Sequence, residues 1–119
     1  MFAFSGTRLR DAVAHQAAFN VIHVPTVIKI DCIVRKDTPY RRVEFARRRI
    51  IPVEGHAIRV VSPEDLVLSK LAWAKPSHSE MQLRDVRNLI GCVPDLDWQH
   101  LDHWARELDV ADLLAKVRP

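Results

Sequence analysis

The chain has 119 residues, of which 48% are apolar, 28% are charged and three are glycine. These values exclude a disordered or fibrous chain and predict one domain with a hydrophobic core, residues 1–119. No apolar run approaches the ~20 residues of a membrane-spanning helix, and the N-terminus has no signal-peptide pattern, so we expect a cytoplasmic protein without membrane contact. Cys32 and Cys92 have neither disulfide-framework nor metal-ligand spacing, which favours free thiols.

Basic residues are concentrated in one segment, although the formal net charge of the whole chain is only +3. Between positions 35 and 49 the chain has seven basic residues and two acidic ones. Five of the seven are Arg41, Arg42, Arg47, Arg48 and Arg49. Two interpretations stay open for this segment: a solvated basic face, or a surface that contacts RNA or nucleotide phosphates.

The first third of the chain predicts two neighbouring strands. Residues 11–19 are consistent with the end of an amphipathic helix, and β-branched residues then dominate 19–24 and 27–34, on either side of a Pro-Thr break. In the second strand Lys29 and Asp31 share one face, while the other face is wholly apolar and predicts burial. A carboxylate in a buried strand needs a partner. Asp31 is therefore either paired with a cation such as Lys29 or a ligand for a divalent metal.

The strongest local signal opens a helix over residues 62–74. Ser62 has the chemistry of an N-cap, Pro63 suits the first helical position, and Asp65 stands three residues after the cap. Apolar side chains cover nearly the whole circumference of this helix, which predicts burial in the middle of the domain. Lys70 interrupts them, and it either extends its ammonium to water along an apolar stem or points it at an anion.

Three further helices are predicted after this one. Ser79, Asp97 and Asp109 are their expected N-caps. In the second of them His100 and His103 have the i, i+3 spacing of metal ligands, but no third ligand is evident and we expect a structural role for the pair.

Together these elements predict an α+β fold, with a small mixed β-sheet, packed helices and a helical C-terminal half. A basic helix over residues 40–48 precedes a hairpin whose turn is Glu54-Gly55. Residues 1–61 are then mainly sheet with this one basic helix, and residues 62–119 form the helical half.

Three short motifs, in this order, resemble the later motifs of nucleotidyltransferase-fold proteins, most closely those of the minimal and abortive-infection toxin type. The motifs are Lys29-Ile-Asp31 in a strand, Ser62-Pro-Glu-Asp-Leu-x-Leu-x-Lys70-Leu at the start of a buried helix, and Gln82-Leu-Arg-Asp85-Val on the next helix. The resemblance covers residues from about 19 to 114. It implies a nucleotidyltransferase fold and metal-dependent transfer of a nucleotide from a nucleoside triphosphate (NTP) to a protein or RNA hydroxyl.

The resemblance also assigns roles to individual residues. It makes Asp31 a catalytic carboxylate that binds Mg²⁺, and Lys70 the lysine that contacts the triphosphate. Asp85 becomes the acidic residue that pairs with or orients Lys70, and Lys29 a second cation beside the nucleotide. Mg²⁺ and an NTP are the implied cofactors.

One part of the family pattern is missing from the chain. The family carries a Gly-Ser turn followed by Asp-x-Asp, whose two carboxylates are the primary metal ligands, and no such motif occurs here. The segment that should carry it is expected upstream of Met1. Because a divalent cation needs several oxygen ligands, we expect this chain alone to be inactive or incomplete as a nucleotidyltransferase.

Two kinds of partner are predicted. Loss of the family's first strand would leave a sheet edge open, and an open edge favours pairing with a second copy, so we expect a homodimer. The alternative function is a non-catalytic binding module, such as a toxin–antitoxin component or a regulatory subunit. It would contact RNA or an acidic protein through the arginines at 41–49. A folded remnant without activity is a third interpretation.

Overall fold

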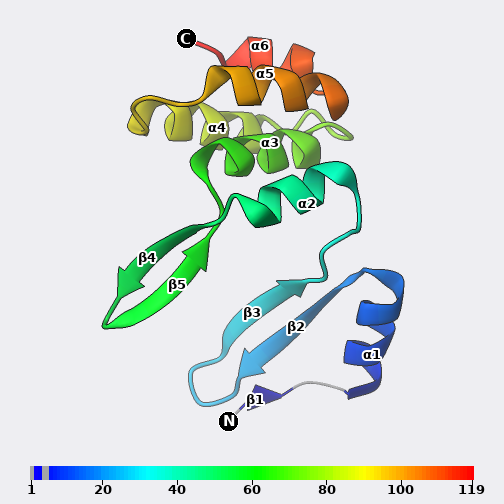
Figure 1. Ribbon diagram of the computed structural model, residues 1–119. Helices are drawn as coiled ribbons and strands as arrows, with labels where there is room; N and C mark the ends of the chain where they lie inside the picture. The colour runs from blue at the N-terminus through cyan, green and yellow to red at the C-terminus, as the bar shows by residue number, and fades with distance from the viewer. Residues whose placement is uncertain (1, 4–5) are drawn as a thin grey trace. The chain divides into compact units, whose positions relative to one another are not determined.

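The computed structural model describes residues 2–3 and 6–119. The chain forms two compact units, Met1–Arg41 and Arg42–Pro119, and the boundary between them falls inside one helix, α2 (Figure 1). The predicted α+β class is confirmed. In the described part of the chain no helix is both long and apolar enough to cross a bilayer.

The first unit contains a three-stranded sheet and one helix. Its elements are β1 (Phe2–Ala3), α1 (Gly6–His15), β2 (Ala18–His23) and β3 (Ile28–Ile33). The strand order is β1-β2-β3 and both pairings are antiparallel, with Asn20 opposite Asp31 and Ile22 opposite Lys29. Both predicted strands are therefore present, and the helix ends at His15 instead of continuing towards Phe19.

The prediction that the second of these strands is buried was wrong. Every side chain of β3 is exposed except that of Cys32, which is partly covered. The helix of this unit packs against β2. Alternation of apolar side chains shows that a strand has an apolar face, but it does not show that another element covers that face.

Helix α2 (Pro39–Ala46) and a hairpin come next. The Thr38 hydroxyl accepts a hydrogen bond from the backbone N–H of Arg41 at 3.3 Å, as an N-cap does. The strands β4 (Arg49–Val53) and β5 (His56–Val60) pair antiparallel, in a sheet of their own. Glu54 and Gly55 have φ values of 48° and 79°, which a two-residue hairpin turn of the I′ kind requires, so the predicted hairpin is confirmed.

The sheets differ from the single mixed sheet that the sequence predicted. Every described strand pairing is antiparallel, and the strands are divided between two sheets. The connection between β2 and β3 and that between β4 and β5 are short turns. A short turn allows antiparallel pairing alone, because a parallel neighbour needs a crossover of a dozen or more residues.

Four helices complete the second unit: α3 (Pro63–Ala74), α4 (Glu80–Cys92), α5 (Trp98–Glu107) and α6 (Ala111–Val117). Helix α3 packs against α4 and α5, and α6 packs against the same two helices (Figure 1). On α3, Val67, Leu68 and Leu71 are fully buried, which confirms that this helix is central to its unit. Helix α3 is not buried on every side, because Trp73 is 50% exposed.

The N-caps show where local sequence determined the structure and where it did not. The side chains of Ser62, Ser79 and Asp97 each accept a hydrogen bond from the backbone N–H three residues later, as predicted. The prediction that Asp109 caps the last helix was wrong, since the N-cap of α6 is Val110 and has no side-chain cap. Asp109 instead accepts a 2.8 Å hydrogen bond from the Lys75 ammonium.

Candidate functional sites

Lys70 and Asp85 lie together on neighbouring helices. The Nζ atom of Lys70, on α3, is 3.4 Å from Oδ2 of Asp85, on α4. The Lys70 side chain is 23% exposed and that of Asp85 is 45% exposed, so the ammonium lies at the edge of the helical core. An ammonium has three donors and this hydrogen bond uses one of them. The pair is thus able to accept a further anionic group from solvent.

A buried acidic cluster, Glu64 and Asp65, occupies the first turn of α3. Asp65 has no exposed surface, and its carboxylate accepts hydrogen bonds from the Ser62 hydroxyl at 2.7 Å and from Arg47 Nε at 3.3 Å. Its other oxygen lies 2.8 Å from His100 Nε2. Because a carboxylate only accepts, His100 donates through Nε2. The expected structural role of His100 agrees with this geometry.

Glu64 is buried beside Asp65 and has a different set of partners. Its Oε1 atom accepts a hydrogen bond from the backbone N–H of Asp97 at 3.0 Å, which joins the start of α3 to the start of α5. Its Oε2 atom lies 3.9 Å from Arg47 and 3.9 Å from Arg49, within ion-pair range. The same atom has no hydrogen-bond partner among the described residues. Glu64 is therefore held by a hydrogen bond through Oε1 and by charge alone through Oε2.

The arginines predicted as a phosphate-binding patch take part in contacts within the chain. Arg47 and Arg49 form the ion pairs with the acidic cluster, Arg47 with both of its carboxylates and Arg49 with Glu64. The guanidinium of Arg48 lies 3.5 Å from the centroid of the Phe45 ring, and its Nε donates to the Phe45 carbonyl at 2.6 Å. This side chain therefore lies back over the helix that precedes it.

The remaining two arginines of the patch belong to α2. The Arg41 guanidinium is 5.3 Å from the centroid of the Tyr40 ring, and Arg42 is exposed. Among the described residues, most arginines of this segment therefore contact other groups of the same chain and do not form an open basic surface. The sequence showed the density of basic residues, but it did not show that buried carboxylates far along the chain would neutralise two of them.

Asp31 and Lys29 form an exposed ion pair on β3. Lys29 Nζ is 3.5 Å from Asp31 Oδ1, and their side chains are 57% and 63% exposed. The sequence left two interpretations open for Asp31, an ion pair with a cation or a ligand for a metal. In the structure Asp31 forms the ion pair. Among the residues it describes, no group of three or more His, Cys, Asp or Glu side chains is placed to hold a metal ion. Asp31 and Lys70 belong to different units.

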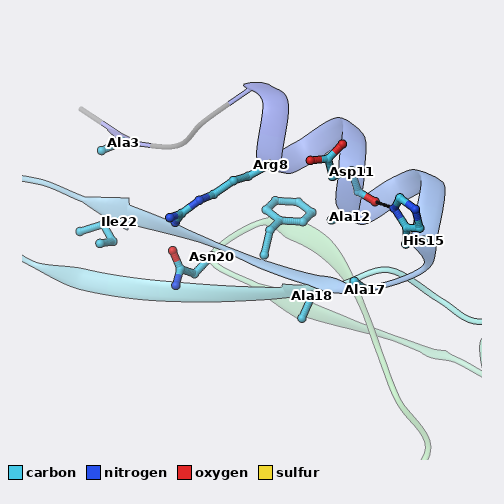
Figure 2. A pocket seen from close by; sticks show the side chains of 10 residues that line it. Ala3, Arg8, Asp11, Ala12, His15, Ala17, Ala18, Asn20 and Ile22 are labelled. Carbon is cyan, nitrogen blue, oxygen red and sulfur yellow. Dashed lines mark hydrogen bonds between the residues drawn. The ribbon is translucent and has the colours of Figure 1, made fainter.

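A pocket that was not predicted from the sequence lies in the first unit, between α1 and β2. Its volume is about 750 Å³, and its polar lining comes from Arg8, Asp11 and His15 of α1 and Asn20 of β2 (Figure 2). His15 Nδ1 is 2.9 Å from the backbone oxygen of Asp11, drawn as a dashed line in Figure 2. The signal for this lining was the i, i+3, i+7 spacing of the three helical residues. The lining contains one guanidinium, of Arg8, and one carboxylate, of Asp11, and their charges offset each other. The charge of the lining therefore favours neither an anion nor a cation.

A second hollow, of about 380 Å³, lies along one side of α5. Asp97, Gln99, His100, His103 and Arg106 line it. Because Nε2 of His100 is hydrogen-bonded to Asp65, that nitrogen is not available to a ligand in this hollow.

Comparison with known proteins gives no match to a family model, to a curated protein or to a solved structure.

Proposed function

We propose that the second unit of this chain binds the triphosphate of a nucleotide through Lys70, with Asp85 orienting the ammonium, as the resemblance to nucleotidyltransferases implies. The observation that supports the proposal is the contact between Lys70 and Asp85, 3.4 Å apart across two packed helices. The resemblance assigns both residues to the same function.

The stability that its ion pair contributes gives little reason for a lysine at position 70. Partly exposed ion pairs contribute between about 0 and 1 kcal/mol, and Asp85 is 45% exposed. Position 70 stands directly before the fully buried Leu71, and apart from Ser69 the other positions from Leu66 to Ala74 of this helix are apolar. A lysine there positions a charge with two unused donors at the edge of an apolar core, where a phosphate oxygen would be less screened than in bulk water.

The described residues around Asp31 do not fit a magnesium site. Mg²⁺ requires near-octahedral oxygen ligands, while Asp31 is a single exposed carboxylate that is already paired with Lys29. The proposed function is therefore nucleotide binding alone. Transfer of a nucleotide to a hydroxyl would need the carboxylates that a Gly-Ser turn followed by Asp-x-Asp supplies in the family, and this sequence lacks that combination.

The alternative function, a module that binds RNA or an acidic protein through the arginines at 41–49, has less support. Binding of an external phosphate by Arg47 or Arg49 would compete with their ion pairs to the buried acidic cluster. Removing a cation from a buried carboxylate is costly, which disfavours that exchange.

Isothermal titration of the chain with ATP, GTP and CTP, with and without magnesium chloride, tests the proposal. We expect at least one nucleotide to bind, and Lys70→Met to weaken that binding tenfold or more. Asp85→Asn should weaken it less, because the cation remains. The matched control is Lys75→Met, which removes another aspartate-paired lysine close to the end of the same helix and should leave binding unchanged.

Two results would contradict nucleotide binding at this pair. One is the absence of heat with every nucleotide for a folded chain. The other is binding that Lys70→Met and Lys75→Met weaken equally, since that would indicate a general effect of positive charge. Circular dichroism of each variant establishes that its helices are intact.

A further inference from the structure

Strand β3 forms an edge of its sheet. Among the described residues it pairs with β2 on one side and with no strand on the other. Its outer backbone N–H and C=O groups are therefore available to another strand. Edge strands in proteins are commonly protected by proline, bulges, coverage or charged side chains, and β3, Ile-Lys-Ile-Asp-Cys-Ile, has no proline but carries the charges of Lys29 and Asp31. Its apolar side chains are open to solvent, with Ile30 45% and Ile33 68% exposed.

The charges on this strand are arranged symmetrically about Ile30. Lys29 precedes Ile30 and Asp31 follows it, and the alternation of a strand puts both charges on one face and Ile30 on the other. Two copies of such a strand, placed antiparallel with Ile30 opposite Ile30, bring each lysine opposite the aspartate of the other copy. The strand is thus complementary in charge to itself.

We propose that β3 pairs with β3 of a second copy of this chain, antiparallel and centred on Ile30. In this register Lys29 lies opposite the partner's Asp31, and Asp31 lies opposite the partner's Lys29. Directly opposite side chains in an antiparallel pair have Cβ atoms about 4.5–5.5 Å apart, close enough for two ion pairs between the copies. The two three-stranded sheets then become one six-stranded antiparallel sheet.

The neighbouring symmetric registers are unfavourable. A two-fold axis through position 29 places two lysines opposite each other, and one through position 31 places two aspartates opposite each other; like charges directly opposite destabilise a strand pair. A shift of one residue between the copies would also place residues of opposite faces across from each other. Charge therefore favours the Ile30 register over the neighbouring symmetric ones.

The second face of the strand agrees with the same register. Ile30 meets the partner's Ile30, and Ile28 meets the partner's Cys32, so every opposite pair on that face is apolar. The other strand pair, β4 and β5, is less suited to pairing with a second copy. In β4 an edge is interrupted by Pro52, which has no N–H to donate, and β5 has Arg59 without a carboxylate on the same strand.

Charge reversal and its compensation test the pairing by sedimentation equilibrium. We expect the chain to dimerise at tens of micromolar. Lys29→Asp alone and Asp31→Lys alone should each weaken the dimer tenfold or more, because each puts like charges opposite one another, and the double variant should restore it. Lys36→Asp, the same change outside the strand, is the control and should leave the dimer intact. A monomer at 100 µM, or a double variant no stronger than the single ones, would overturn the proposal.

Cysteine cross-linking tests the register itself. In a Cys32→Ser, Cys92→Ser background, Ile30→Cys should form a covalent dimer with a short thiol cross-linker. Lys29→Cys alone should not, but it should cross-link to Asp31→Cys when the two variants are mixed. Cross-linking of Lys29→Cys to itself as efficiently as Ile30→Cys would overturn the register.

The pairing is independent of nucleotide binding at Lys70. Lys70→Met should dimerise as the unaltered chain does, whether or not it still binds nucleotide. The failure of one proposal is therefore distinguishable from the failure of the other.

Discussion

Replacing Asp65 by asparagine should destabilise the second unit strongly, although the two side chains have almost the same volume. Three donors converge on the Asp65 carboxylate: the Ser62 hydroxyl, Arg47 Nε and His100 Nε2. An asparagine offers one oxygen and one NH₂ group in place of two oxygens. Either His100 would have to change tautomer to face the NH₂ group, or Ser62 and Arg47 would lose their acceptor, and in both cases Arg47 would lose its charged partner.

The magnitude follows from burial. Breaking a buried ion pair by removing one partner costs about 3–5 kcal/mol, and Asp65 has no exposed surface. The Arg47 side chain is 34% exposed and remains beside Glu64, so water and that carboxylate offset part of the loss. We therefore expect a loss of about 3 kcal/mol, at the lower end of this range. The free energy of unfolding of a domain of this size is about 5–15 kcal/mol, so this loss should be readily measurable.

Urea unfolding followed by tryptophan fluorescence measures this loss, because all three tryptophans, Trp73, Trp98 and Trp104, lie in the second unit. Glu107→Gln makes the same change of carboxylate to amide at an exposed position and should alter the free energy of unfolding by no more than about 0.5 kcal/mol. A loss below about 1 kcal/mol for Asp65→Asn, with an unchanged denaturant slope, would refute the view that this carboxylate organises the unit.

Three smaller predictions concern other parts of the chain. The hydrogen bond and charge of the Lys75 ammonium hold the pKa of Asp109 below its ordinary value of 3.8. The stability that the pair contributes is therefore present above pH 3.8 and is lost as the pH falls through the pKa of the folded state. Lys75→Met should return the pKa of Asp109 towards 3.8 in an NMR titration. Leu68→Ala should lower the free energy of unfolding by about 3 kcal/mol in urea titrations, because Leu68 is fully buried and a cavity would remain. Gly55→Ala should cost about 1–2 kcal/mol at the hairpin turn, where φ is 79°, and should speed amide hydrogen exchange across the hairpin; unchanged exchange would count against the turn geometry.

The elements that the sequence predicted well are those whose signals are local. The caps at Ser62, Ser79 and Asp97 depend on a hydrogen bond between residues three apart, so the deciding atoms are close together in the sequence. The hairpin turn at Glu54-Gly55 is local in the same sense. These signals could be interpreted without knowledge of the fold.

The predictions that failed depended on distant contacts. Asp109 has the chemistry of a cap, but Lys75, 34 residues earlier, binds its carboxylate instead. The hydrogen bond between Asp65 and His100 joins residues 35 apart, and no periodic pattern relates them. For the same reason the sequence identified the basic residues at 41–49 without indicating that Arg47 would reach the start of α3.

The structure divides the longest motif of the nucleotidyltransferase resemblance into two parts with different roles. Ser62, Glu64 and Asp65 are buried and joined to α5 and to the arginines, so that half of the motif is accounted for by folding. Lys70 has no comparable structural task, since its one described partner, Asp85, is itself partly exposed. The two halves should therefore respond differently to mutation: Asp65→Asn should lower the free energy of unfolding, and Lys70→Met should weaken nucleotide binding in a chain of nearly normal stability. If Lys70→Met instead destabilised the chain as much as Asp65→Asn, the lysine would be a structural residue, and the resemblance would no longer support a binding site.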